Sequence, residues 1–151
     1  MFALRNYTKI ICAALCAFSC ASGNFLTPEK AFSGVYAAFA KQDIALMRNI
    51  LSIQSIAKIE AMRKSFAAMD VNQANEAAKL YGISGEEFKS ISLEKFISVF
   101  LSSQKDVIFS GNFSLAEVRE SGDSAVVLLR NGNELDFVKE GIYWKFDLTA
   151  L

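Results

Sequence analysis

The chain of 151 residues contains no histidine, one proline and three cysteines. Histidine titrates closest to neutral pH and is the commonest metal ligand, so its absence removes the most frequent general acid–base group and many metal sites. The cysteines are Cys12, Cys16 and Cys20, so the rest of the chain contains neither a disulfide nor a cysteine pair for zinc. We therefore expect no metal, no cofactor and no catalytic residue of the common kinds.

The sequence also lacks an excess of either charge, because 16 basic and 16 acidic residues give a net charge of zero. Without residues 1–19, 14 basic and 16 acidic residues remain, a formal charge of −2. The sequence shows no basic patch or block of like charge. We therefore expect no nucleic-acid partner.

The N-terminus has the three parts of a secretory signal peptide. Arg5 and Lys9 are the only charged residues in the first nineteen, residues 10–18 are uniformly apolar, and small residues follow at 19–23. The apolar run is well short of the ~20 residues that a membrane-spanning helix needs. The pattern predicts export rather than a permanent transmembrane helix.

Residues 17–20 (AFSC) resemble the lipobox of bacterial lipoproteins, with Ser19 in its usual place and Ala17 where leucine is common. The resemblance implies cleavage before Cys20, attachment of diacylglycerol to its thiol and acylation of its freed amine with palmitate-type chains. Residues 1–19 are then the signal peptide and residues 20–26 a short tether. The alternative is ordinary cleavage after Ala21, which releases a soluble secreted or periplasmic protein.

The segment from Thr27 to Leu101 has apolar residues at helical spacing and predicts a series of helices. Thr27-Pro28-Glu29 supplies a hydroxyl cap, a proline at the first helical position and an acid near the positive helix end. Asp43 is placed to cap a second helix. Asn72 is placed to cap a later helix that stops at Gly82.

The periodicity changes after Val107 and predicts an antiparallel β-meander. The apolar phase slips after Leu115, which predicts a β-bulge that turns Ala116 and Val118 towards the core. Residues 125–129 are apolar on both faces, as in a central strand, and Asn131-Gly132 predicts a hairpin turn. The closing strand places four apolar residues on one face: Ile142, Trp144, Phe146 and Leu148. Residues 27–151 are thus predicted to form one α+β domain, with N-terminal helices packed on a curved antiparallel sheet.

Two segments carry a resemblance to a known superfamily: residues 27–43 (TPEKAFSGVYAAFAKQD) and residues 138–147 (VKEGIYWKFD). They are similar to the nuclear transport factor two-like superfamily, which includes SnoaL-like and ketosteroid isomerase-like proteins, and to small bacterial lipoproteins of unknown function within it. The resemblance implies a cone-shaped fold whose sheet curls around an aromatic pocket. Tyr36, Tyr81, Phe100 and Trp144 are the candidate pocket-lining residues, and each also fits an ordinary position in the core.

These patterns favour a non-catalytic module that binds a small apolar ligand or an envelope protein, held to the cell membrane or outer membrane through its lipid. A related reading is an accessory subunit of a larger envelope complex. The alternative is a soluble SnoaL-like isomerase or cyclase with an Asp/Tyr pocket, in which aspartate acts as base. The acids considered for that role are all expected to face solvent: Asp43, Asp70, Asp106, Asp136 and Asp147.

Overall fold

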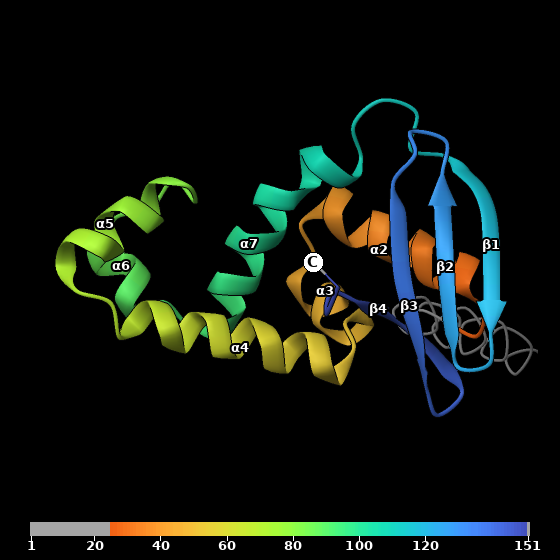
Figure 1. Ribbon diagram of the computed structural model, residues 1–151, viewed down its shortest axis with the longest axis horizontal. Coiled ribbons are helices and arrows are strands. Elements are labelled where there is room, and N and C mark those ends of the chain that lie inside the picture. Colours follow the sequence, from red (N-terminus) through yellow and green to blue (C-terminus); the bar gives the residue numbers. More distant parts are fainter. Residues whose placement is uncertain (1–24, 151) are drawn as a thin grey trace, which may run out of the picture.

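The computed structural model describes residues 25–150, so the predicted signal peptide and Cys20 lie outside the described residues. Within this part of the chain, six helices precede one antiparallel sheet of four strands. The predicted α+β class and the order of helices and strands are therefore confirmed. Figure 1 shows an elongated molecule, with the sheet at one end and α5 and α6 at the other.

The helices are α2 (Pro28–Lys41), α3 (Ile44–Ile50), α4 (Ile53–Ala67), α5 (Val71–Lys79), α6 (Gly85–Ser90) and α7 (Leu93–Ile108). Each begins after a Ser, Thr or Asp whose side-chain oxygen accepts a hydrogen bond from a backbone N–H of the first turn. Thr27 and Asp43 cap α2 and α3 as predicted. The prediction for Asn72 was wrong: Asp70 caps α5 instead, accepting from the N–H groups of Asn72 and Gln73.

The strands are β1 (Leu115–Ser121), β2 (Ser124–Leu129), β3 (Glu134–Glu140) and β4 (Tyr143–Asp147), and they pair in the order β1-β2-β3-β4. β2 is central, as its apolar faces predicted. The register shifts between Leu115 and Glu117, which confirms the bulge. Ala116 is the extra residue and is exposed, so its predicted place on the core face was wrong, whereas Val118 is half-buried.

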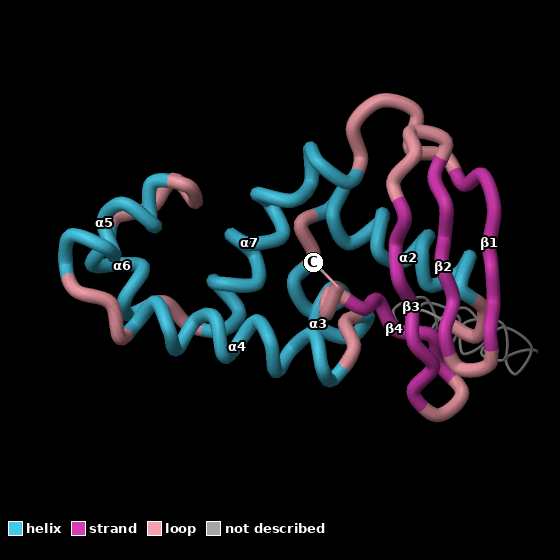
Figure 2. The backbone as a smooth tube through the Cα atoms, viewed as in Figure 1, coloured by secondary structure: helices cyan, strands magenta, loops and turns pink. Residues whose placement is uncertain are grey.

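The two outer hairpins, β1–β2 and β3–β4, turn at the same end of the sheet, and the β2–β3 turn lies at the opposite end (Figure 2). Ile142 belongs to the β3–β4 turn and is 63% exposed, which corrects its predicted place on the buried face. Trp144, Phe146 and Leu148 are buried as predicted. The turn at Gly141 needs a positive φ, here 64°, and this ends the alternation that a continuous strand would have extended to Ile142.

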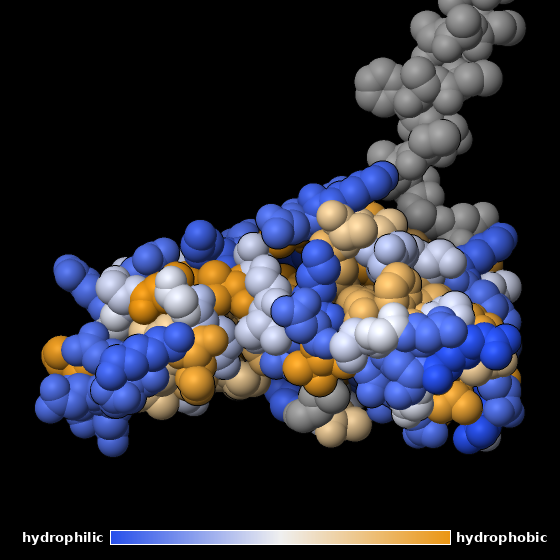
Figure 3. Space-filling model, turned by 90° about the horizontal axis from the view of Figure 1, so that it is seen from above, coloured by the Kyte–Doolittle hydropathy of each residue, from blue (hydrophilic) through white to orange (hydrophobic). Residues whose placement is uncertain are grey.

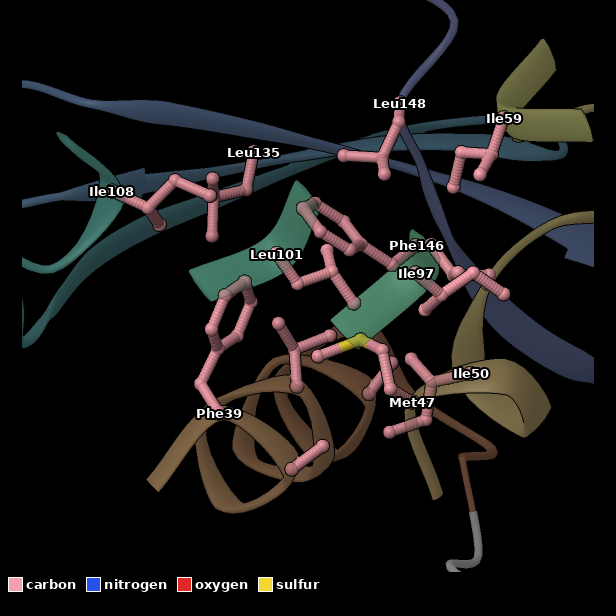
Figure 4. Packing of buried hydrophobic residues seen from close by; sticks show 14 of the residues in the cluster. Phe39, Met47, Ile50, Ile59, Ile97, Leu101, Ile108, Leu135, Phe146 and Leu148 are labelled. Carbon is pink, nitrogen blue, oxygen red and sulfur yellow. The ribbon is translucent and has the colours of Figure 1, made fainter. Parts of the chain in front are cut away.

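The main core lies between the sheet, α2, α3 and α7. Figure 4 shows Ile97 and Leu101 of α7 between Phe146 of the sheet and Met47 of α3. All four side chains are at most 4% exposed. The segments that meet here are far apart in the sequence, so this core holds the N-terminal helices and the C-terminal sheet together.

Residues 60–96, which we call the distal lobe, extend away from the sheet; we call the rest of the described chain the body (Figure 1). The lobe contains an aromatic cluster that continues the main core. In it, Phe88 lies 4.6 Å from Phe66 and 5.4 Å from Tyr81, measured between ring centroids. Arg63 binds Glu60 through two hydrogen bonds of 2.7 Å and donates a third to the Ile91 carbonyl at 3.2 Å. No helix within residues 25–150 is long and apolar enough to cross a membrane.

Candidate functional site

A groove runs between α3 and α7. Its larger part has a volume of about 630 Å³ and is mainly apolar. The hollow exists because small side chains, Ala45, Ser92 and Ser98, line it where longer residues would fill the space. Arg48 and Glu94 join the two helices across it, with 2.7 Å between the guanidinium and carboxylate.

The groove continues towards the corner between α2 and α3, where a second hollow of about 290 Å³ shares Ile44 and Ser98 with the first. Buried Met47 and Leu101 line this part. Its charged lining residues carry both signs: Asp43, Lys105 and Asp106. We call the two hollows together the α3–α7 groove.

The α3–α7 groove is of the size that small-molecule sites have, about 300–1,000 Å³. It can accept an apolar molecule or an apolar peptide segment, with charged groups at its margin to fix the orientation. None of the four predicted pocket residues lines it. The sequence signal for it is the set of small residues that interrupts the apolar faces of residues 44–51 and 93–101.

Tyr36 lies on the flank of α2 and is 41% exposed. Its ring stacks on Phe113 with centroids 4.9 Å apart and meets the edge of Phe109 at 5.6 Å. Phe109 also contacts Phe39 of the main core at 5.0 Å. Tyr36 therefore belongs to an aromatic group between α2 and the connection from α7 to β1.

Tyr81 and Phe100 are both neighbours of Phe96, with centroids 6.2 Å and 6.3 Å from its ring. Tyr81 is part of the distal lobe's aromatic cluster, and burial raises the pKa of its hydroxyl. Phe100 lines a small hollow of about 180 Å³ between α4 and α7, beside Leu148 and Lys58. These two residues share one neighbour but face different surroundings.

Trp144 is 3% exposed and packs in the sheet core, with the Lys139 ammonium 5.7 Å from its ring centroid. Its backbone N–H donates a 2.7 Å hydrogen bond to the carbonyl of Phe25 at the outer edge of β4. The structure thus places Trp144, Tyr36 and the Tyr81–Phe100 pair at three separate locations. A ligand-contacting role for each of the four stays a prediction.

A buried polar network, which no sequence pattern predicts, joins β4 to the start of α4. The Asp147 carboxylate accepts hydrogen bonds of 3.0 Å from both Ser52 and Ser55, which are fully buried, and a 2.7 Å bond from the Thr149 hydroxyl. Ser55 in turn accepts a 2.7 Å bond from the Leu148 N–H. Burial alone would raise the pKa of Asp147, but these hydrogen bonds outweigh it and hold the pKa below its usual range.

Asp136 lies directly opposite Asp147 in the register of β3 and β4. Both are on the outward phase of their strands, as predicted, but they are half-buried rather than freely solvated. Burial raises the pKa of Asp136, and the negative charges of Asp147 and Glu134 raise it further. Asp43 and Asp70 cap helices, and Asp106 is exposed at the end of α7.

Within residues 25–150, no group of three or more acidic, histidine or cysteine side chains is arranged to hold a metal ion. Comparisons with protein-family models, curated proteins and solved structures find no significant match to this chain.

Proposed function

We propose that this protein is a bacterial lipoprotein, anchored through diacylglyceryl-Cys20, whose α+β domain is a non-catalytic binding module of the cell envelope. The position of Phe25 supports a short connection between the lipid and the domain. It is 3% exposed, and its carbonyl is bonded to β4, so the packed domain begins five residues after Cys20. A diacylated, amine-acylated cysteine supplies the two or more chains that stable anchoring requires.

The docking of Phe25 depends on Gly34 of α2. A Cβ atom at Gly34 would lie 2.5 Å from the Phe25 ring and 3.1 Å from Ile50, so any larger residue there would push Phe25 out. Five Cα–Cα steps of 3.8 Å separate Cys20 from Phe25, so the tether spans no more than about 19 Å. The domain therefore works within about 2 nm of the bilayer that holds its lipid.

The α3–α7 groove supports the binding role. Its larger hollow is mainly apolar, its smaller hollow carries charged residues of both signs, and it has the volume of a small-ligand site between α3 and α7. We propose that it receives a small apolar ligand or an apolar segment of an envelope protein. The order of elements, helices followed by a meander, supports membership of the nuclear transport factor two-like superfamily.

The alternative isomerase role draws on one observation, the raised pKa of Asp136, which resembles that of a catalytic base. Asp136 lies on the outward face of the sheet, whereas Tyr81 lies in the distal lobe. Asp136 and Tyr81 are thus in two parts of the molecule and do not form the Asp/Tyr pair that such a pocket needs. The geometry favours binding over catalysis.

Intact and N-terminal peptide masses of the protein purified from its native host test the anchor. We expect a chain that begins at Cys20 and carries acyl mass, and we expect Cys20→Ser to lose that mass and leave the membrane fraction. A chain that begins at Ser22 without modification would contradict the proposal. It would indicate a soluble secreted protein.

Binding of an apolar fluorescent probe, anilinonaphthalene sulfonate, tests the groove. Ser98→Phe fills the point that both hollows share, and we expect it to weaken probe binding severalfold. Ser103→Phe is the matched control, because Ser103 lies on the same helix but is exposed and lines neither hollow. Equal binding by the two variants would contradict a site in the α3–α7 groove.

A further inference from the structure

The end of the body at which the tether enters also carries several exposed apolar side chains. Phe25 lies beside Trp144, so its neighbour Leu26 and the β3–β4 turn are at this end. Leu26 is 42% exposed, Ile142 63% and Tyr143 43%. Ile53, at 72%, is nearby, because its N–H donates a 2.8 Å hydrogen bond to Glu140 at the base of the same turn.

Within residues 25–150, the other large exposed apolar side chains belong to α2, α5 and α7. Figure 3 shows hydrophobic residues in several separate areas of one face, interspersed with charged residues. The other large exposed apolar side chains lie on several elements: Tyr36 on α2 beside Phe109 and Phe113, Val71 and Leu80 at the two ends of α5, and Val107 in the last turn of α7. The tether end is thus distinguished by position as well as by apolar content.

We propose that Leu26, Ile53, Ile142 and Tyr143 form a second membrane contact, which lies in the interfacial layer of the bilayer that holds the Cys20 lipid. This inference rests on the proposed lipid anchor. A tether of at most about 19 Å keeps these side chains at a high effective concentration next to the lipid, so weak apolar contacts suffice. Tyr143 suits this depth, since tyrosine places an apolar ring and a polar hydroxyl at the headgroup level.

The charges at this end indicate an apolar contact rather than an electrostatic one. The charged residues near the turns of the two hairpins carry both signs: Glu120, Asp123 and Glu140 are acidic, and Arg119, Lys139 and Lys145 are basic. A basic cluster of the kind that attracts anionic lipid is absent from these hairpins. We therefore expect the contact to form equally on zwitterionic and anionic bilayers.

The contact also fixes which surfaces face away from the membrane. Val107 marks the opposite end of the sheet, because its carbonyl accepts a 2.8 Å hydrogen bond from Asn133 in the β2–β3 turn. Val107 and Ile142 are each 63% exposed. They are therefore a matched pair of positions for a depth measurement.

The test uses the full lipoprotein, floated on phosphatidylcholine vesicles that contain lipids with a nitroxide on the acyl chain. Ile142→Cys and Val107→Cys each place one free thiol in the mature chain, because Cys20 is acylated, and each is labelled with an environment-sensitive fluorophore. We expect the label at 142 to be quenched severalfold more than the label at 107. Vesicles containing phosphatidylglycerol should give the same ratio.

The outcomes separate the contact from the anchor. If both variants float but the two labels are quenched equally, the second contact is wrong and the lipid anchor stands. If neither variant floats, the anchor is wrong, and the contact that rests on it is overturned as well. A large excess of quenching at 142 that also survives high salt supports an apolar contact at the tether end.

Discussion

The body and the distal lobe are held together by different kinds of contact. In the body, residues more than ninety positions apart meet: Ser55 bonds Asp147, and Ser52 donates its N–H to the Phe146 carbonyl. In the distal lobe, the aromatic cluster of Phe66, Tyr81, Phe88 and Phe96 comes from a single stretch of 31 residues.

This difference has consequences for how the molecule opens. The body joins the N-terminal helices to the C-terminal strands, so loss of one contact loosens segments from the whole chain. α5 packs chiefly on α6, and α6 packs on α4. We therefore expect the lobe to open before the body unfolds, as small cooperative units do.

The largest expected effect is in the body, for Phe146→Ala. Phe146 is 1% exposed and its ring lies 5.5 Å from that of Phe137. Removal of a buried phenylalanine ring costs about 3–5 kcal/mol of unfolding free energy, and we expect one cooperative transition at lower urea. Ile142→Ala, at an exposed position of the adjoining turn, should change stability by less than about 0.5 kcal/mol. A Phe146→Ala loss as small as the control's would contradict the long-range core.

Phe88→Ala is the corresponding change in the distal lobe, because Phe88 is fully buried among the other aromatic rings. The cavity again costs up to about 3–5 kcal/mol in the lobe. We expect a smaller loss in the free energy of global unfolding, because the lobe should open locally first. Hydrogen exchange should show faster exchange of amides 60–96 with protection retained in β2 and β3. Leu80→Ala, at an 80% exposed position, is the control. Equal acceleration in the sheet would show that lobe and body unfold as one unit.

Some local features of the fold were predictable from short sequence patterns. Thr27 and Asp43 predicted two helix starts, and the phase slip after Leu115 predicted the bulge. Both predictions succeeded because caps and bulges depend on a few adjacent residues. The sequence predicts Asn72 as the cap of α5, two residues after the actual cap, Asp70, because both residues suit an N-cap chemically. Only the entry angle of the chain decides between them.

The candidate site was much less predictable. The superfamily resemblance implies a pocket lined by aromatic residues such as Tyr36 and Trp144, whereas the hollow lies where side chains are small, as at Ala45 and Ser98. The Ser52–Ser55–Asp147 network was equally hidden, since it joins positions 92 or more residues apart. Such contacts depend on how complete elements pack and leave no periodic signal.

Asp147→Asn tests the link that fastens the sheet edge to α4. Hydrogen bonds to a charged acceptor contribute about 1.5–3 kcal/mol, so we expect a loss of that order at pH 7. The folded pKa of Asp147 lies below its unfolded value of about 3.9, so the stabilisation is present above that pH and is lost as pH falls through the folded pKa. The variant should therefore lose this acid dependence in urea titrations from pH 7 to pH 2. Asp123→Asn, in an exposed turn, is the control. If the unfolding free energy of Asp147→Asn depended on pH as strongly as that of the wild type, the network's role would be contradicted.

Asp136→Asn should have the smallest effect and the opposite sign. Like charges directly opposite on adjacent strands are destabilising by about 0.2–1 kcal/mol, so removal of this charge should stabilise the body by that amount at pH 7. Because the folded pKa of Asp136 is raised, the folded state holds its proton more tightly, and wild-type stability falls as pH rises through that pKa. The advantage of the variant should vanish below about pH 3.9, where the carboxyl is protonated in both states. Paired urea titrations at pH 7 and pH 3, with exposed Asp106→Asn alongside, measure it. A variant less stable than wild type at pH 7 would mean that Asp136 makes a favourable ionic contact. Asp136 and Asp147 would then both stabilise the pairing of β3 with β4, and their mutual repulsion would not be the dominant effect.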